Sequence, residues 1–180
     1  QKPVKVPTPN RAPKVIIGDK VGCPRYAGLF LRGVTVGPSP LWLQVRLIVS
    51  GLRPINNIVD VTNYFMLLTG QPMHAFDADK IAGAITVRRA KKNEKLVILN
   101  GETKKLSPDD LVIADTKQAL ALAGVMGGLP SAVTAETKNI FLEVANFEGS
   151  SVRRTKNRHN LPTDASYRFE RNLDPNLVGE

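Results

Sequence analysis

The stretch SPLWLQVRLIVSGLRPINNIVDVTNYFMLLTG, residues 39–70, decides most about the fold. Ser39-Pro40 predicts the start of a first helix, because serine can cap free backbone amides and proline fits the first helical turn. The apolar run that follows continues this helix to about residue 50. Gly51 is suited to a left-handed end.

A second helix is expected from Ile58 to about Thr69, opened by Asn57 and closed by Gly70. Apolar residues recur along it at intervals of three and four, which predicts one buried face. These residues are Ile58, Val61, Tyr64, Phe65 and Leu68. The two helices form an N-terminal helical pair.

Outside the helical pair, short apolar runs separated by turn residues predict β-strands. The runs lie at residues 84–90, 95–100, 111–115, 119–124 and 140–145, and a mixed run at 25–36 predicts one or two more strands. Asn100-Gly101 suits a tight hairpin turn. Residues 148–160 predict a surface helix or loop, and Thr163 is expected to cap a final short helix. The fold class is therefore α+β (mixed). A doubly wound nucleotide-binding sheet is disfavoured, because no strand–helix alternation appears.

Composition narrows the class of protein. The chain has 180 residues, of which 42% are hydrophobic and 23% charged. This length and composition are typical of a soluble globular protein with one sizeable domain or two small ones, and exclude disorder throughout. No apolar run is long enough for a membrane span. Cys23 is the only cysteine, which excludes a disulfide within the chain and fits a reducing, cytoplasmic setting.

Residues 1–20 predict a proline-rich basic linker. Pro3, Pro7, Pro9 and Pro13 remove backbone donors and disfavour helix before them, so residues 1–14 are expected to be extended. The folded domain is expected over residues 21–180, with the start of a following module after residue 172 as an alternative. The missing initiator Met suggests a piece of a longer protein.

The formal net charge is +9, from 25 Lys and Arg against 16 Asp and Glu. Such an excess indicates either a nucleic-acid partner or a basic solvated surface. Arg153, Arg154, Lys156 and Arg158 place four cations in six residues, which predicts either phosphate contacts or a solvated face. Few aromatic residues are available for base stacking, so backbone contacts should dominate any RNA binding.

Two polar residues are candidates for a functional site. His74, in a predicted loop after the second helix, either lines a cleft or is tied into the structure by backbone hydrogen bonds. Glu143 interrupts the apolar run NIFLEVA, where alternation places it on the same face as Phe141 and Ala145. Because an unpaired buried carboxylate is costly, Glu143 either lies in a polar site or points to water from an edge strand.

Other patterns give weaker signals. The glycine cluster AGVMGG, residues 123–128, lacks the Gly-Lys-Ser/Thr of a phosphate loop. It indicates either a turn in which side chains would clash or a place where a ligand approaches the backbone. Asp77 and Asp79 are expected to form turns. With two histidines and one cysteine, no metal site is expected.

The stretch SGLRPINNIVDVTNYFMLLTGQPMHAFDADKI, residues 50–81, resembles the beta subunits of bacterial phenylalanyl-tRNA synthetases. The resemblance continues in CPRY at 23–26, PSPLWLQVRL at 38–47, LAGVMGG at 122–128 and TDASYRFERNLDP at 163–175. It covers the family's B3/B4 module and implies a three-layer β/β/α sandwich. Asn172 and Asn160 stand where the family usually has glycine, and these departures concern the local backbone.

The resemblance implies a proofreading (editing) module, which hydrolyses the ester of tRNA(Phe) wrongly charged with tyrosine. It implies catalytic roles for His74, Glu143 and Thr163. The implied substrate-binding residues are Arg53, Ala123, Gly127, Glu143 and Ala165. Glu143 would read the phenol, while Arg53 and Thr163 would orient the terminal adenosine or the ester. Because no activated Ser or Cys is apparent, an oriented water is expected to attack.

The implied partners are the acceptor end of tRNA(Phe), tyrosine as the mischarged amino acid, and the synthetase alpha subunit in a full heterotetramer. No membrane partner is expected. ATP and magnesium belong to the full enzyme, so this piece is expected to carry no cofactor and no aminoacylation activity. The alternative is a non-catalytic structural or tRNA-contacting module of the same subunit.

Overall fold

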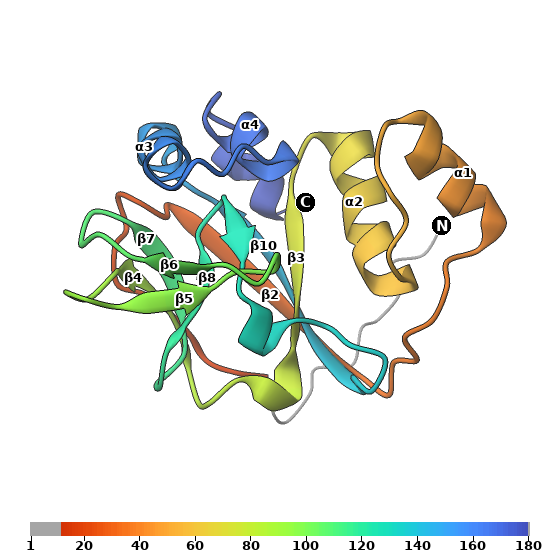
Figure 1. The fold of residues 1–180 in the computed structure, drawn as a ribbon, viewed down its shortest axis with the longest axis horizontal. Coiled ribbons are helices and arrows are strands. Elements are labelled where there is room, and N and C mark those ends of the chain that lie inside the picture. The colour runs from red at the N-terminus through yellow and green to blue at the C-terminus, as the bar shows by residue number, and fades with distance from the viewer. Residues whose placement is uncertain (1–11, 180) are drawn as a thin grey trace.

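Two β-sheets face each other, and a pair of helices covers the outer side of the smaller sheet (Figure 1). This is the arrangement in a computed structural model that describes residues 12–179. The larger sheet has the order β1(Val15–Ile17), β4(Ile85–Arg89), β7(Leu111–Ala114), β8(Ala119–Leu122) and β9(Met126–Gly127). Strand β1 is parallel to β4, and the other pairs are antiparallel.

The smaller sheet has the order β2(Arg25–Arg32), β10(Asn139–Asn146) and β3(Met73–Asp77). Strand β10 lies in the middle and is antiparallel to both neighbours. A hairpin of β5(Lys95–Val97) and β6(Thr103–Lys105) forms a separate pair, and Gly101 in its turn has a φ of 88°. The predicted hairpin turn at Asn100-Gly101 is therefore confirmed.

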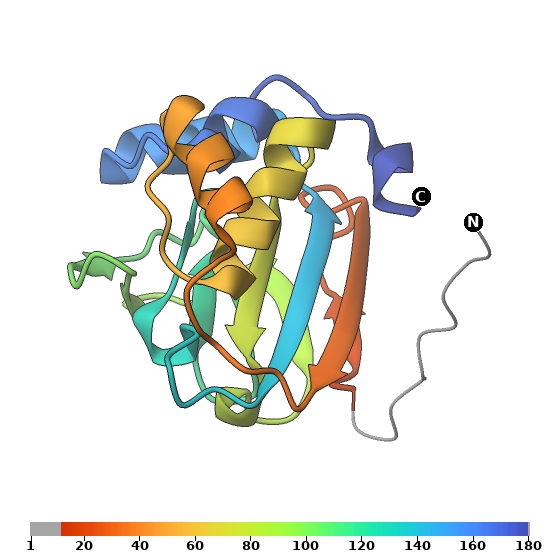
Figure 2. The same cartoon turned by 90° about the vertical axis from the view of Figure 1, so that its right-hand side faces the viewer.

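The described residues also form four α-helices: α1(Leu41–Val49), α2(Asn57–Thr69), α3(Gly149–His159) and α4(Asp164–Phe169). Short 3₁₀ helices lie at η1(Ala78–Lys80), η2(Leu129–Ser131) and η3(Pro175–Gly179). Helix α2 packs on β3, and α1 packs on α2, as the turned view in Figure 2 shows. The larger sheet, the smaller sheet and the helical pair thus form three layers. The predicted mixed class and N-terminal helical pair are confirmed.

The main core lies between the two sheets. Phe76 on β3 and Phe141 on β10 are cross-strand partners, and both are fully buried. They pack against apolar side chains from the larger sheet, among them Ile85, Val87, Ile113 and Leu122. Side chains alternate along a strand. The same inner face therefore carries the residues two positions away, which are His74 and Glu143.

Several predicted boundaries were wrong. Ser39 does not cap α1. Its hydroxyl instead donates a 2.5 Å hydrogen bond to the buried carboxylate of Asp60, which also accepts the Ile55 amide at 2.8 Å. The cap of α2 is Asn56, one residue before the predicted Asn57, whereas Gly70 ends the helix in the left-handed conformation as expected.

The buried face predicted for α2 was also wrong. Val61, Phe65 and Leu68 are 56%, 40% and 66% exposed, while α2 turns Asp60 and Thr62 inward. The periodicity found a real apolar stripe. However, no described part of this chain covers that stripe.

The predicted linker also contains a strand. Residues 15–17 form β1 and pair with β4, so the folded region begins before residue 21. The part of the predicted linker before residue 12 lies outside the described residues. In the part of the chain that the structure describes, no helix has the length and apolarity needed to cross a bilayer.

Candidate active site

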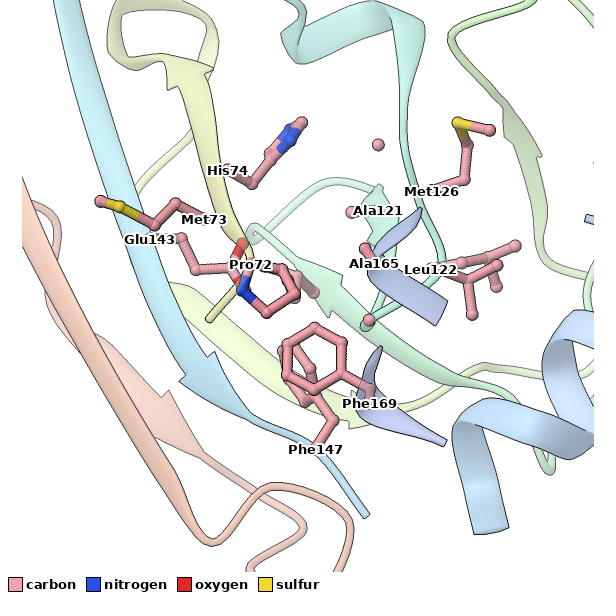
Figure 3. A pocket seen from close by; sticks show the side chains of 14 residues that line it. Pro72, Met73, His74, Ala121, Leu122, Met126, Glu143, Phe147, Ala165 and Phe169 are labelled. Carbon is pink, nitrogen blue, oxygen red and sulfur yellow. The ribbon is translucent and has the colours of Figure 1, made fainter. Parts of the chain in front are cut away.

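A pocket of about 80 Å³ opens between the inner faces of the two sheets, beside the turn after β8 and the start of α4 (Figure 3). Pockets for drug-sized ligands measure about 300–1,000 Å³. This one therefore suits a single side chain better than a nucleotide. Its walls include Pro72, His74, Gly124, Val125, Met126, Gly127, Glu143, Phe147, Ala165 and Phe169.

Glu143 is held on the middle strand of the smaller sheet, so the edge-strand alternative was wrong. The residue is only 5% exposed. Burial raises the pKa of its carboxyl group to about 8, because no donor or cation among the described residues stabilises the charged form. At neutral pH the carboxyl group of Glu143 is therefore mostly protonated. Such a group needs a hydrogen-bond partner that the described chain does not provide.

His74 lies on β3, so its placement in a loop was wrong. It is directly opposite Glu143 in the antiparallel register, which puts both side chains on one face. Its Nε2 atom is buried without a hydrogen-bond partner, contrary to the alternative of a histidine tied down by the backbone. Burial lowers its pKa to about 4, so the imidazole is neutral at pH 7.

The glycine cluster forms the wall next to His74. A Cβ atom added to Gly127 would lie 2.5 Å from His74 Cε1 and 2.9 Å from Nε2. Gly124 has a φ of 69°, in the left-handed region that favours glycine. The prediction of a turn in which side chains would clash is confirmed. Contact between a ligand and this backbone stays a prediction.

Helix α4 is positioned by Thr163, as predicted. The Thr163 hydroxyl donates to the Val125 carbonyl at 2.8 Å and accepts the Ser166 amide at 3.1 Å, while the Ser166 hydroxyl accepts the Thr163 amide at 2.9 Å. This capping box joins the start of α4 to the glycine turn and brings Ala165 into the pocket. Thr163 itself is not among the lining residues, and its catalytic role stays a prediction.

The structure thus brings together four of the predicted site residues: His74, Gly127, Glu143 and Ala165. Ala123 lies behind the pocket wall, where it is 2% exposed and its amide donates to the Leu111 carbonyl. Arg53 is exposed in the segment between α1 and α2 and does not line the pocket. Its contact with substrate stays a prediction.

Sequence reasoning missed Tyr26. This residue pairs with Ala145, on the face of the sheet that carries Glu143. Its hydroxyl is buried without a partner, and burial, followed by the charge of Glu143, raises its pKa well above the usual range. The motif CPRY contains this residue. Only the register of β2 against β10, however, shows that it lies near the carboxyl group.

The predicted basic run lies on α3, and carboxylates neutralise much of it. Lys156 pairs with Glu170, and Arg158 pairs with Asp110 and Asp109. Arg154 lies 3.8 Å from Glu148. Arg153 forms no ion pair with the described residues and borders a polar surface hollow with Lys156. Free positive charge for phosphates is therefore concentrated at the start of this run.

The predicted turn-forming aspartates have structural roles. Asp77 accepts the Asp79 amide at 3.1 Å, and Asp79 accepts hydrogen bonds from the Asn139 side chain. Among residues 12–179, no group of three or more His, Cys, Asp or Glu side chains is placed to hold a metal ion.

Comparisons with known proteins agree with this architecture. A family model described as the B3/4 domain matches residues 22–180. Phenylalanine–tRNA ligase beta subunits from Bacteroides fragilis and Solibacter usitatus are 49% and 55% identical over 92% and 90% of this chain. The one from Anaeromyxobacter dehalogenans is 51% identical over 93% of the chain. The matched region is only 20–21% of these relatives, so the chain spans about a fifth of their length.

A solved structure is similar in fold. It is an N-terminal fragment of the phenylalanyl-tRNA synthetase beta subunit from Pyrococcus horikoshii, with a TM-score of 0.54 and 17% identity. The likeness covers 81% of this chain and 49% of that fragment. At this level of identity the match supports the fold alone.

Proposed function

This chain belongs to the B3/4 domain family of phenylalanine–tRNA ligase beta subunits, and we propose that it is the module that edits Tyr-tRNA(Phe). The observation that carries the proposal is the buried carboxyl group of Glu143, which has no partner and stands opposite His74 in a pocket the size of one side chain. A phenol entering this pocket would give that group the hydrogen bond it lacks.

Selectivity follows from the same geometry. Phenylalanine differs from tyrosine by one hydroxyl group and would leave Glu143 buried and unpaired. Sites built around a substrate hydroxyl reject the analogue without it by about 10⁴–10⁵-fold. An apolar synthetic pocket excludes an added hydroxyl much less well, by about 10²-fold. A second site that reads this hydroxyl is therefore useful to a phenylalanine ligase.

In the proposed reaction, a water molecule attacks the carbonyl carbon of the ester, and the bond to the ribose oxygen breaks. The products are free tyrosine and uncharged tRNA, and the ribose oxygen takes up the proton. His74 is neutral, so its nitrogen can accept a hydrogen bond from this water. The oxyanion contact cannot come from the Val125 or Gly128 amides, because these already donate to Leu122 and Leu120.

The acceptor end of tRNA(Phe) and the alpha subunit of the ligase are the proposed partners. Arg153 forms no ion pair with the described residues, and the Arg154 side chain is 58% exposed against 33% for Arg158, so we assign Arg153 and Arg154 contacts with tRNA phosphates. Replacing Arg153 with Ala should reduce the salt slope of tRNA binding by about 1, whereas Arg158→Ala should change it little. An unchanged slope for Arg153→Ala would remove the assignment.

The test of the editing function is deacylation by the complete ligase. With Glu143→Ala, the preference for Tyr-tRNA(Phe) over Phe-tRNA(Phe) should fall by at least about 10–100-fold, the effect of losing one hydrogen bond to a buried group. Glu136→Ala, which removes an exposed carboxylate that does not line the pocket, is the matched control. If the unaltered ligase fails to hydrolyse Tyr-tRNA(Phe), the alternative of a non-catalytic structural module is favoured instead.

A further inference from the structure

The outer faces of α1 and α2 carry an unusual amount of exposed apolar surface. On α1, Leu41 and Val49 are 75% and 78% exposed, and on α2, Leu68 is 66% exposed. Scattered apolar side chains are normal on protein surfaces, but contiguous patches mark interaction sites. The full set, which we call the helical face, is Leu41, Trp42, Val45, Ile48, Val49, Val61, Phe65 and Leu68.

The helical face is continuous across the two helices. Within each helix its members recur at the spacing of a single stripe. The two stripes meet where the ring of Trp42 packs edge-on against Tyr64, with centroids 5.7 Å apart. The guanidinium of Arg46 lies 5.5 Å and 5.6 Å from these two ring centroids. Figure 2 shows both helices on the outer side of the smaller sheet.

Helix α2 also exposes more of its apolar residues than an ordinary surface helix. It buries Asp60, Thr62 and Met66, of which the two polar side chains are hydrogen-bonded, and exposes Val61, Phe65 and Leu68. An amphipathic surface helix normally directs its apolar stripe to the core. The described part of the chain therefore covers Asp60, Thr62 and Met66 on one side of α2 but leaves the stripe of Val61, Phe65 and Leu68 exposed.

Trp42 on the helical face, together with Tyr64 and Arg46 beside it, indicates a protein partner. Trp, Tyr and Arg are the residues most enriched among those that dominate binding energy at protein interfaces. Nucleic acid fits poorly, because binding it relies on several cations that contact phosphates. Arg46 is the only Lys or Arg within α1 and α2, and it already donates a hydrogen bond to the Tyr64 hydroxyl.

The length of the relatives indicates the identity of the protein partner. The matched region is 20–21% of the beta subunits of Bacteroides fragilis and Solibacter usitatus, so about four fifths of such a subunit lies outside it. A segment tied to the module by the same chain has an effective concentration of the order of millimolar, which favours it over a separate copy. We infer that the helical face docks onto another part of the same beta-subunit chain. This inference rests on family membership and does not depend on the editing reaction.

Cysteine labelling in the assembled ligase tests this docking. Val49→Cys and Leu68→Cys lie on the helical face, and Val21→Cys is a matched control, because Val21 is 77% exposed and Val49 is 78% exposed. From their exposure in this structure alone, Val21→Cys and Val49→Cys should react with a maleimide at similar rates. If the helical face is docked, Val49→Cys and Leu68→Cys should both react with the maleimide at least tenfold more slowly than Val21→Cys. Cys23 is the only native cysteine of this chain and is fully buried, so this module itself adds little background.

A photo-crosslinker attached at Val49→Cys then identifies the occupant. The expected crosslinks join this position to peptides of the beta subunit outside residues 1–180 of this chain. Crosslinks to the alpha subunit, to tRNA, or to the same module of a second copy would overturn the inference. Equal labelling at Val49→Cys and Val21→Cys would overturn it as well. Loss of editing in the Glu143 variants would change neither the expected labelling rates nor the expected crosslinks.

Discussion

On one side of the smaller sheet the structure buries polar groups without partners, and on the other side it exposes apolar side chains without cover. The inner face holds Glu143 and His74, both desolvated and without hydrogen bonds from the described chain. The outer layer presents the helical face, with Val49 at 78% exposure. Each side departs from the usual distribution of residues. Both departures disappear if each side has a partner, a phenol for the pocket and a protein surface for the helices.

A third region shows what a satisfied buried carboxylate looks like. Asp110 is fully buried between α3 and the larger sheet, and it accepts hydrogen bonds from His159 at 2.7 Å, Thr155 at 3.1 Å and the Ser107 amide at 2.8 Å. Burial alone would raise the pKa of Asp110. The bonds from His159 and Ser107, together with Arg158, outweigh burial and lower it. Asp110 therefore stabilises the fold, while Glu143 is expected to destabilise it.

The largest expected effect sharpens this contrast. Asp110→Asn should lower the free energy of unfolding by about 3–5 kcal/mol, because it leaves buried partners uncompensated. Glu143→Gln, an equally conservative change, should leave it unchanged or raise it at pH 7. Urea unfolding of both variants at one pH measures the difference. Equal losses would mean that Glu143 has partners in the fold after all.

The next effect is a pH dependence that belongs to Glu143. The unfolded chain ionises this group above its ordinary pKa of 4.5, while the folded chain keeps it protonated up to about 8. Stability from this group is therefore greatest below pH 4.5 and falls as pH rises, by up to about 1.4 kcal/mol per unit, until it levels off above 8. His74 acts in a lower window. Its pKa falls from 6.5 to about 4 on folding, so stability is lost only as pH drops below 6.5.

Between pH 6.5 and 8, the slope should therefore come from Glu143. Unfolding measured at these two pH values should show a loss of about 2 kcal/mol on going to pH 8 in the unaltered chain. Glu143→Gln should remove that loss, and Glu136→Gln, at an exposed position, should retain it. A slope that survives in Glu143→Gln would show that another group titrates in this range.

A smaller effect tests the packing of the pocket wall. Gly127→Ala should cost about 1 kcal/mol, because the new Cβ atom would lie 2.5 Å from His74 Cε1. In a Gly127→Ala, His74→Ala double variant, this cost of the glycine substitution should disappear. Thermal unfolding of the two single variants and the double variant gives the coupling between the residues. Additive effects would place the imidazole elsewhere.

The smallest expected change in stability is for a substitution on the helical face. Leu68→Gln should change the stability of this chain by less than about 0.5 kcal/mol, because the side chain is 66% exposed. In the complete beta subunit the same change should cost more, since the proposed docking would bury this position. Denaturation of both forms provides the comparison. A large loss in this chain alone would show that the helical face is already covered here.

The sequence allowed the mixed fold, the helical pair and the capping by Thr163 to be predicted, because these depend on local patterns. Periodicity located the apolar stripe of α2 but could not show whether this chain covers it. Alternation placed Glu143 on the same face as Phe141, but it could not distinguish a middle strand from an edge strand. That distinction depends on β2 and β3, which pair with β10 from more than 60 positions away.

Only part of the candidate site could be predicted, again because strand pairing between distant positions is not visible in the sequence. Glu143 and His74 were chosen because each is polar in an apolar setting, and that chemistry is visible in a sequence. Their approach to each other depends on strand register, and the place of Gly127 against the imidazole depends on the packing of β9 beside β3. Tyr26 was missed because its role arises only from that register.

The most direct measurement is a crystal structure of this chain soaked with tyrosine. The account predicts the phenol oxygen within about 3.2 Å of a carboxyl oxygen of Glu143, with the ring between Ala165 and the glycine turn. The same soak with phenylalanine should leave the pocket empty or poorly occupied. Tyrosine bound elsewhere, or bound here with Glu143 still unpaired, would contradict the proposal that this carboxyl group recognises the substrate.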